Sequence, residues 1–394
     1  MELANTPLVI AGFDHQIDRP LLSVPDLLAL SDDEGDLPDA IAPVSKAPTS
    51  GGSTGRPKLI LAGQPGVTQK VTPEVGGWRL RPGSVAVLPA PLYHNAGFGM
   101  MMSAFGVGAH MVILPRFDPE ATLAAVERHR ATWIYLVPTM MNRIWHLPEA
   151  TRARYDLSSL ETLWHLAAPC PPWLKEAFIH WLGGEVIMEL YAGTEAQAAT
   201  TISGTEWLTH RGSVGRVTFG EMKAFDEAGN PLPAGQTGEI YMRRPPGAPP
   251  SYRYLGAEAR TLPDGWESLG DIGWLDEEGY VYLADRRTDM ILVGGSNVYP
   301  AEIEAALEAH PAVQSCAVIG LPDDDMGNVV HAIVQVKGPC DAESLKAHLA
   351  GLLVAYKRPR SFEFVDEPLR DDAGKVRRTA LRDARIAALK AAAG

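Results

Sequence analysis

The sequence predicts an α/β large domain, a parallel sheet with helices plus a small β subdomain, followed by a small α+β C-terminal domain. Three kinds of sequence pattern follow one another along the 394 residues and predict this order. Strand-like and helix-like runs alternate from about residue 84 to 190, short strands and turns fill residues 211–283, and a second mixture follows residue 289. Alternating strands and helices are typical of a parallel sheet covered by helices.

The alternating part contains five short apolar runs that are rich in β-formers. They are SVAVLP, HMVIL, TWIYLV, TLWHLA and EVIMEL. Two helix-like patterns lie among them, PEATLAAVERHR and PWLKEAFIHWL. Pro119 stands in the first turn of the first pattern, where the missing N–H of proline costs nothing. These runs therefore predict successive strands with helical connections.

The other two parts differ in texture. Residues 211–283 contain short strands separated by the turn sequences EAGN, PAGQ and DEEGY, which predict hairpins and the small β subdomain. After Asp289, the strands VQSCAVIG, VVHAIVQV and SFEFV alternate with helices that begin near Pro300 and Ala342, and a basic helical tail follows. These residues predict a separate α+β domain of ordinary size.

Composition and charge argue against several classes of function. The net charge of −13 disfavours a nucleic-acid binder, because no excess of positive charge offsets phosphate repulsion. Apolar runs are interrupted well short of a membrane span. No basic region precedes the first apolar stretch, so no secretory signal is recognised. The three cysteines lie far apart without a metal-binding pattern, and we therefore expect a cytoplasmic location.

The stretch TSGGSTGRPK is the first candidate for function. Its glycines let backbone amides converge on an anion, Ser53 and Thr54 add hydroxyl donors, and Lys58 adds a charge suited to phosphate. Two other interpretations stay open: a solvated linker and, through the pattern G-x-S-x-G, the nucleophile turn of a serine hydrolase. The hydrolase turn needs a strong preceding strand, which Pro48 disfavours.

The loop YAGTE, directly after the run EVIMEL, is the second candidate. Ligands bind at the carboxyl ends of parallel strands in an open α/β sheet. Tyr191 offers a flat ring to a base, Thr194 a hydroxyl to a phosphate, and Glu195 a hard oxygen ligand suited to Mg²⁺. Taken alone, the loop is more simply explained as a turn that carries a solvated glutamate.

Three charged positions complete the set of candidates. Asp271 lies between glycines in ESLGDIG, where a carboxylate can reach the paired hydroxyls of a ribose, although such a residue is more often part of a turn. Arg286 stands at the junction ADRRTDM and is compatible with a surface ion pair. Lys375 belongs to the run DAGKVRR, which taken alone is a solvated charged face.

Together these segments resemble one family. TSGGSTGRPK, YAGTE, ESLGDIGWLDEEGYVYLADRRTDMILVGGSNVYPAEIE and GKVRR are similar in order and spacing to the superfamily of acyl-CoA synthetases, peptide-synthetase adenylation domains and luciferases. The segments VYPAEIE, YKRP and PLYHNAG are most similar to those of fatty-acyl, aryl and bile-acid CoA ligases. Relatives carry a longer segment before the phosphate loop, so we expect a large domain that is N-terminally truncated relative to the family.

The resemblance implies a nucleotide site. Four residues would hold the β- and γ-phosphates of ATP, namely Ser53, Thr54, Gly55 and Lys58. Four others would surround the adenosine, with the tyrosine on the adenine and the acidic residue on the ribose: Ala168, Tyr191, Asp271 and Arg286. Thr194 would contact the α-phosphate, Glu195 together with Thr194 would hold Mg²⁺, and Lys375 would bring its charge to the carboxylate and α-phosphate during adenylation.

The resemblance also implies a substrate pocket and a hinge. Residues His94, Met140, Met141 and Ala196 would lie near the acyl group. Gly294 and Gly295 would line the tunnel for the pantetheine of CoA after the small domain rotates. Thr288 occupies the hinge position. The expected domains are an AMP-binding large domain at 1–286, a hinge at 287–289 and a mobile C-terminal domain at 290–394.

The implied function is activation of a carboxylic acid with ATP to acyl-AMP, followed by transfer to CoA, with AMP and pyrophosphate as the other products. The expected partners are ATP, Mg²⁺, CoA and a bulky, apolar acid, with no nucleic acid and no membrane span, and the sequence allows a homodimer. Two alternatives stay open: a ligase that loads a carrier-protein thiol, and a truncated, inactive relative that only binds nucleotide.

Overall fold

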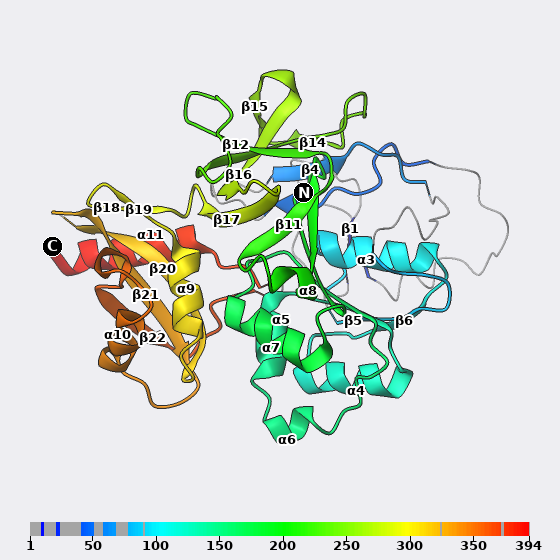
Figure 1. Cartoon of the computed structure of the whole chain (residues 1–394), viewed down its shortest axis with the longest axis horizontal. Helices are drawn as coiled ribbons and strands as arrows, with labels where there is room; N and C mark the ends of the chain where they lie inside the picture. The colour runs from blue at the N-terminus through cyan, green and yellow to red at the C-terminus, as the bar shows by residue number, and fades with distance from the viewer. Residues whose placement is uncertain are drawn as a thin grey trace. The chain divides into compact units, whose positions relative to one another are not determined.

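The computed structural model of the chain describes residues 9–11, 21–23, 41–50, 58–67, 78–89, 91–323, 325–371 and 374–393 (Figure 1). These residues fall into two compact units. The first unit contains the described residues within 1–52, 57–67 and 249–258. The second contains those within 68–248 and 259–394, and therefore most of the chain.

The first unit contains two small sheets among its described residues. In one of them, β1 (Val9–Ala11) pairs in parallel with β2 (Leu21–Ser23). The other is antiparallel in the order β14 (Tyr252–Leu255), β4 (Lys58–Ala62) and β3 (Thr49–Ser50). Strand β4 directly follows the predicted phosphate loop, of which Ser53, Thr54 and Gly55 lie outside the described residues.

The second unit is built on one large mixed sheet. Its parallel half has the order β6-β5-β7-β8-β9. The bounds of these strands are β5 (Val85–Leu88), β6 (His110–Ile113), β7 (Trp133–Leu136), β8 (Thr162–His165) and β9 (Ile187–Ala192). They coincide with the five apolar runs, and these strand predictions are confirmed.

Helices cover both faces of these parallel strands. In Figure 1, α3 (Asn95–Gly106) lies on one side of the strands, and α4 (Pro119–His129), α5 (Pro138–Trp145) and α7 (Pro172–Leu182) lie on the other. The helices α4, α5 and α7 each begin at a proline. The side chain of Asp118 caps α4 by accepting a hydrogen bond from the amide of Ala121 at 2.7 Å. Two shorter helices are α6 (Glu149–Arg152) and α8 (Gly204–Trp207).

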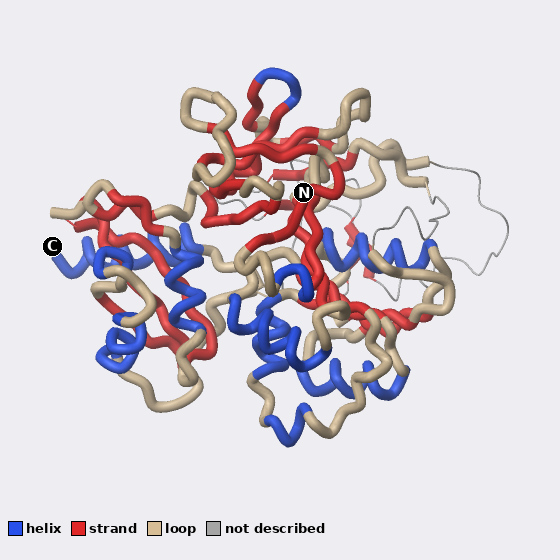
Figure 2. Tube along the Cα trace, viewed as in Figure 1, coloured by secondary structure: helices blue, strands red, loops and turns tan. Residues whose placement is uncertain are grey.

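The antiparallel strands continue the same sheet instead of forming a separate subdomain sheet, as the red strands of Figure 2 show. Strand β10 (Ala199–Ser203) returns beside β9, with Thr200 opposite Tyr191. From there the order is β11-β17-β16-β13-β12, and β15 pairs with β16. The bounds are β11 (Ser213–Phe219), β12 (Glu221–Phe225), β13 (Gly238–Arg243), β15 (Arg260–Leu262), β16 (Trp266–Leu275) and β17 (Tyr280–Arg286).

The residues after the large sheet form an α+β arrangement. The hairpin of β18 (Ile291–Val293) and β19 (Ser296–Val298) precedes α9 (Pro300–Glu308). A three-stranded sheet then follows in the order β20 (Val313–Asp323), β21 (Gly327–Val336) and β22 (Ser361–Val365). Two α-helices, α10 (Ala342–Ala350) and α11 (Arg378–Ala393), and a 3-10 helix at Ala355–Lys357 also belong to this described part.

Side chains that alternate along β20 build two cores in this C-terminal part. Val318 packs in a cluster with Ile303 of α9 and Leu345 of α10. Its neighbour Ile319 packs in a different cluster that includes Leu381 of α11. Because successive side chains of a strand point to opposite faces, α9 and α10 cover one face of this sheet and α11 covers the other. The predicted fold class, with its small α+β C-terminal domain, is confirmed.

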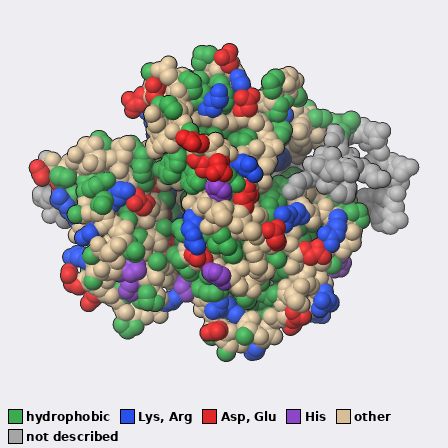
Figure 3. Space-filling model, in the orientation of Figure 1, with side chains coloured by type: hydrophobic (Ala, Val, Ile, Leu, Met, Phe, Trp, Pro, Cys, Tyr) green, Lys and Arg blue, Asp and Glu red, His purple; other side chains and the backbone are tan. Residues whose placement is uncertain are grey.

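Charged side chains are found at the surface, outside these apolar cores (Figure 3). On the face drawn in Figure 3, acidic and basic side chains are interspersed with apolar ones. Among the helices in the described part of the chain, none is long and apolar enough to cross a bilayer.

Candidate active site

The site lies where the parallel strands of the second unit end. Residues Leu136, His165 and Glu189 are aligned across the parallel strands β7, β8 and β9. The carboxyl ends of these strands therefore lie side by side at one end of the sheet, which we call its carboxyl edge. The loops that follow begin at Val137, at Leu166 and, after β9, at Gly193. Loops at such an edge form the usual ligand site of an open α/β sheet.

An acidic residue at this edge is held between a phenol and a guanidinium. The hydroxyl of Tyr191 donates to Oδ2 of Asp271 at 2.6 Å, and Nε of Arg286 lies 3.2 Å from Oδ1. Asp271 and Arg286 face each other across β16 and β17, and Asp271 is buried while Arg286 is exposed. The structure therefore brings together three residues that the sequence assigned to one nucleoside.

Burial and charge set the protonation of this group. Burial, and then the charge of Asp271, raise the pKa of Tyr191 well above its usual value, so the phenol stays protonated and donates. The carboxylate of Asp271 also raises the pKa of Arg286. The trio is thus a neutral donor and a permanent cation on one carboxylate, whose remaining lone pairs can accept from ligand hydroxyls.

The loop after β9 turns tightly and buries Glu195. A Cβ on Gly193 would collide with Cδ1 of Leu269 and lie 3.0 Å from Oε2 of Glu195, so a larger residue there would require these side chains to shift. The amide of Ala196 donates to the carbonyl of Gly193 at 3.1 Å, and Ala196 has a left-handed φ of 54°. Glu195 is 6% exposed, and its charge contributes to the raised pKa of Arg286. The loop therefore holds a buried carboxylate near the trio.

This buried carboxylate has the donor chemistry of a magnesium site. Among the described residues, no group of three or more His, Cys, Asp and Glu side chains is arranged around a common point. Mg²⁺ in nucleotide enzymes commonly binds one or two carboxylates and takes its other ligands from phosphates and water. Glu195 fits that pattern, and Thr194, which precedes it in the chain, adds a hydroxyl oxygen.

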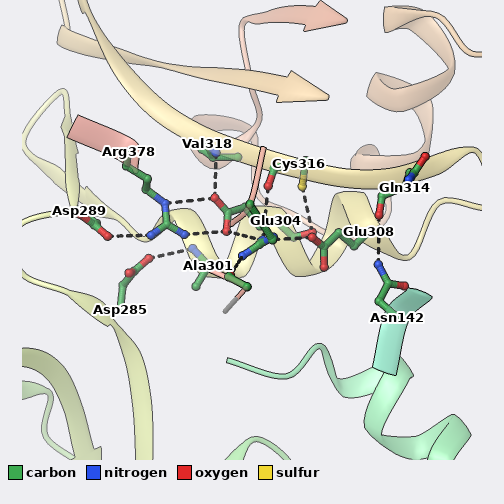
Figure 4. Close-up of polar contacts among 12 residues, drawn as sticks. Asn142, Asp285, Asp289, Ala301, Glu304, Glu308, Gln314, Cys316, Val318 and Arg378 are labelled. Carbon is green, nitrogen blue, oxygen red and sulfur yellow. Dashed lines mark hydrogen bonds and ion pairs between the residues drawn. The ribbon is translucent and has the colours of Figure 1, made fainter. Parts of the chain in front are cut away.

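The turn after β8 and the C-terminal part line one cavity. The large-sheet side contributes Ala168, Thr139 and Asn142, and the C-terminal side contributes Gln314 and Arg370 among others. The amide of Asn142 donates to the carbonyl of Gln314 at 3.1 Å, which joins the two sides directly (Figure 4).

The loop that carries Lys375 reaches the same edge. Gly374 is buried, and a Cβ there would lie 2.7 Å from Oγ1 of Thr139 and 3.6 Å from Cγ2 of Val137. The amide of Lys375 donates to Oδ1 of Asp371 at 2.9 Å, while its side chain is exposed. Gly374 therefore allows a contact that brings the lysine to the carboxyl end of β7.

The other assigned residues lie elsewhere. Lys58 belongs to the first unit, where its Nζ lies 3.6 Å from the centroid of the Tyr254 ring. Gly294 and Gly295 form the turn of the β18–β19 hairpin, with φ of 53° and 81°, and the amide of Gly294 donates to the carbonyl of Met326 at 2.9 Å. Their predicted roles stay predictions.

The residues predicted for the acyl pocket occupy two environments. Met140 and Met141 are 2% and 0% exposed, and both belong to the main core around β7 and α7. His94 precedes the first residue of α3, and its ring lies 4.5 Å from that of Tyr93. Ala196 is exposed on the loop after β9. Their contact with an acid stays a prediction.

The structure contains a buried cluster of charged and titratable side chains beneath the site that the sequence did not lead us to predict. Nζ of Lys175 lies 2.5 Å from Oε2 of Glu189, and both side chains are almost completely buried. Nδ1 of His165 lies 3.9 Å from the other oxygen of Glu189, and neither ring nitrogen has a hydrogen-bond partner among the residues that the structure describes. The available signal was Glu189 inside the apolar run EVIMEL, because a buried acid needs a partner.

The buried histidine predicts a pH dependence of stability. Burial lowers the pKa of His165 from 6.5 to about 4. The folded state therefore binds fewer protons than the unfolded state between these values, and stability present above pH 6.5 is lost as the pH falls towards 4. Because each pH unit corresponds to about 1.4 kcal/mol for one proton, the free energy of unfolding that depends on His165 is roughly 3 kcal/mol at most.

We expect His165→Leu, of similar volume, to lose much of this dependence. The check is the free energy of unfolding of both proteins, measured by urea denaturation at several pH values between neutrality and 4. A wild-type protein that gains stability on acidification over that interval, or a variant with an unchanged slope, would contradict the assignment.

Comparisons with known proteins place this geometry in a family. Residues 45–252 match the family described as AMP-binding enzyme, and residues 302–375 match the AMP-binding enzyme C-terminal domain. The chain is 35% identical over 363 residues to a feruloyl-CoA synthase of Amycolatopsis sp., covering 90% of this chain and 73% of that protein. It is 33% identical over 340 residues to a long-chain-fatty-acid–CoA ligase of Bacillus subtilis (strain 168), covering 84% and 60%.

Solved structures agree. The o-succinylbenzoate CoA synthetase of Bacillus subtilis, in complex with its acyl-adenylate intermediate, has a TM-score of 0.80 at 26% identity, covering 98% of this chain and 80% of that one. An amide bond synthetase of Marinactinospora thermotolerans has a TM-score of 0.74 at 28% identity, covering 96% and 75%. The resemblance seen in the motifs is thereby confirmed, and the chain belongs to the AMP-binding enzyme family.

Proposed function

We propose that this chain is an acid–thiol ligase that activates a carboxylic acid with ATP and transfers the acyl group to CoA. The observation that carries the proposal is the arrangement at the carboxyl edge of the sheet. There the loop of Lys375 lies against Thr139 and Val137, next to the turn of Ala168, on the edge that also delivers Tyr191 and Glu195. A cation, a nucleoside-binding trio and a buried carboxylate at one edge suit adenylation.

The nucleotide would be held by the groups already described. The ribose hydroxyls would donate to the carboxylate of Asp271, whose two oxygens contact Tyr191 and Arg286. The ring of Tyr191 would lie along the base, with Ala168 nearby. Thr194 would donate to the α-phosphate. When bound by Glu195 and Thr194, Mg²⁺ would supply positive charge to the phosphates.

In the first step, a carboxylate oxygen of the acid would attack the α-phosphorus of ATP. The bond from that phosphorus to the β-phosphate oxygen breaks, and pyrophosphate leaves with the electron pair. Catalysis of such substitution is mainly positioning and neutralisation of charge. The ammonium of Lys375 would bind the incoming carboxylate and the α-phosphate together, which brings two anions within reach of each other.

In the second step, the sulfur of CoA would attack the acyl carbonyl. The bond from that carbon to the bridging oxygen breaks, AMP leaves with that oxygen, and the thiol proton passes to solvent. We assign the large domain to 1–286, the hinge to 287–289 and the C-terminal domain to 290–394. A rotation of the C-terminal domain about Thr288 would move Lys375 out of the site and bring Gly294 and Gly295 to the path of the pantetheine.

We propose a bulky, apolar acid as the substrate. The support is the named relatives, which act on feruloyl and long-chain fatty acyl groups. The core methionines Met140 and Met141 would lie under such a group, since Met side chains adapt to apolar ligands. Assembly as a homodimer stays a prediction.

The experiment is a screen for pyrophosphate release with fatty, aryl and steroid carboxylates. We expect release that requires both an acid and ATP, and a thioester when CoA is added. A carrier-protein thiol or an amine as the only productive acceptor would retain adenylation and change the second step. Nucleotide binding without any acid-dependent release would contradict the proposal and favour the inactive relative.

A further inference from the structure

Two arginines bracket the loop that carries Lys375. Arg370 stands before the loop and forms an isolated antiparallel bridge with Val376. Its Nη1 donates to the carbonyl of Gly374 at 3.3 Å. Arg378 stands at the other end of the loop as the first residue of α11. The backbone around Lys375 is therefore fixed from both sides by guanidinium groups.

Both arginines are anchored on α9. The guanidinium of Arg378 donates to both oxygens of Glu304, from Nε at 3.2 Å and from Nη2 at 2.7 Å (Figure 4). Nη2 of Arg370 lies 3.4 Å from Oε2 of Glu304 and 3.2 Å from Oε1 of Glu308. One helix thus holds both ends of the loop.

This network is buried, although the run GKVRR taken alone reads as a solvated face. The side chains of Glu304, Arg370 and Arg378 are 6%, 16% and 17% exposed. Burial opposes the charge of Arg378, but the carboxylates around it, chiefly Glu304, outweigh that effect and raise its pKa. Burying such charges is costly, so a network of this kind is often not explained by stability alone.

The same guanidinium reaches the hinge. Nη1 of Arg378 lies 2.7 Å from Oδ2 of Asp289, the residue after Thr288 (Figure 4). On the other side of the hinge, Oδ2 of Asp285 accepts a hydrogen bond from the amide of Ala301, in the first turn of α9, at 2.8 Å. Arg378 is therefore the residue through which the hinge, α9 and the lysine loop meet.

We infer that Arg378 is a positioning residue for adenylation: it ties the lysine loop and the hinge residue Asp289 to Glu304, so that Lys375 reaches the carboxyl edge as part of one rigid body. This inference rests on the proposed role of Lys375 in forming acyl-AMP. Because Arg378 acts through the loop, its loss should affect the step that uses Lys375 and should largely spare the step that does not.

The first test compares half-reactions in Arg378→Ala and in a matched control. Outer residues that orient a catalytic group typically contribute about 10- to 100-fold, so we expect acyl-AMP formation to fall by about that factor. Thioester formation from supplied acyl-AMP and CoA should change little. Arg378→Lys keeps the positive charge but loses the bidentate contact with Glu304. Its adenylation rate should therefore lie between those of Arg378→Ala and the wild type.

The control is Arg385→Ala, on the same helix. Arg385 forms an ion pair of the same kind, with Nη2 2.7 Å from Oε1 of Glu363, a residue of β22, and not with α9 or the hinge. We expect both half-reactions to be unchanged in this variant. Equal losses of both half-reactions in Arg378→Ala, or no loss of adenylation, would overturn the inference.

A second readout does not depend on activity. Trypsin cleaves after lysine, and the bond from Lys375 to Val376 lies in the loop between Arg370 and Arg378. Cleavage at this bond, followed by mass spectrometry, should be faster in Arg378→Ala and in Arg378→Lys than in the wild type or Arg385→Ala. An unchanged cleavage rate would show that the contacts of Arg378 do not hold the loop in place. A wild-type protein that never forms acyl-AMP would instead remove the proposed function, whatever the cleavage rates.

Discussion

Replacing Lys375 by alanine is expected to lower the rate of acyl-AMP formation by about a hundred- to a thousandfold, the usual cost of removing a charge or donor aimed at a transition state. The contact of Gly374 with Thr139 and Val137 brings this lysine to the carboxyl edge, where the carboxylate and α-phosphate would meet. In the proposed second step the thiol attacks without the help of this charge, so we expect thioester formation from supplied acyl-AMP to be largely retained.

The measurement is each half-reaction assayed separately, with Lys346→Ala as the control. Lys346 is paired with Glu343 on α10, remote from the lysine loop in sequence, and its removal should change neither half-reaction. If Lys375→Ala loses both half-reactions equally, the lysine has a structural role and the two arrangements of the C-terminal domain do not apply to this chain.

Replacing Glu195 by glutamine is the second change with a large expected effect. The amide keeps the shape of the side chain but removes the charge that Mg²⁺ prefers, so adenylation should fall by about two orders of magnitude or more and need more Mg²⁺. Glu195 is buried, so water cannot easily take the place of its carboxylate.

This effect is measured as pyrophosphate release over a range of Mg²⁺ concentrations. Glu343→Gln, at a side chain that is 80% exposed on α10, serves as the matched control and should behave as the wild type. Release at the wild-type rate and with the wild-type Mg²⁺ dependence in Glu195→Gln would remove this residue from the metal site.

The elements of the fold were predictable where the signal is local. Runs such as TWIYLV identify themselves as strands by their β-formers, and Pro119, Pro172 and Pro300 mark helix starts. The joining of the parallel and antiparallel strands into one sheet was not predictable, because it depends on β10 returning beside β9 in register. Such pairing between strands is a long-range property that no local pattern encodes.

The family resemblance named candidate site residues, but it could not give their contacts. Tyr191 and Asp271 were assigned to one nucleoside through the family resemblance, and their 2.6 Å hydrogen bond joins positions 80 residues apart. The charged residues beneath and behind the site were missed for a common reason. In a sequence, a lysine such as Lys175 or an arginine such as Arg378 has the appearance of a surface charge, and only the fold shows that a carboxylate has been buried beside it.

The most direct test of the central claim follows one oxygen atom. The acid that is active in the screen is labelled with ¹⁸O in both carboxylate oxygens and turned over with ATP, Mg²⁺ and CoA, and the AMP is analysed by mass spectrometry. If the carboxylate attacks the α-phosphorus, the bridging oxygen stays with the phosphate when the thiol displaces AMP. The account therefore predicts one ¹⁸O in each AMP formed. Unlabelled AMP, or ADP in its place, would contradict it.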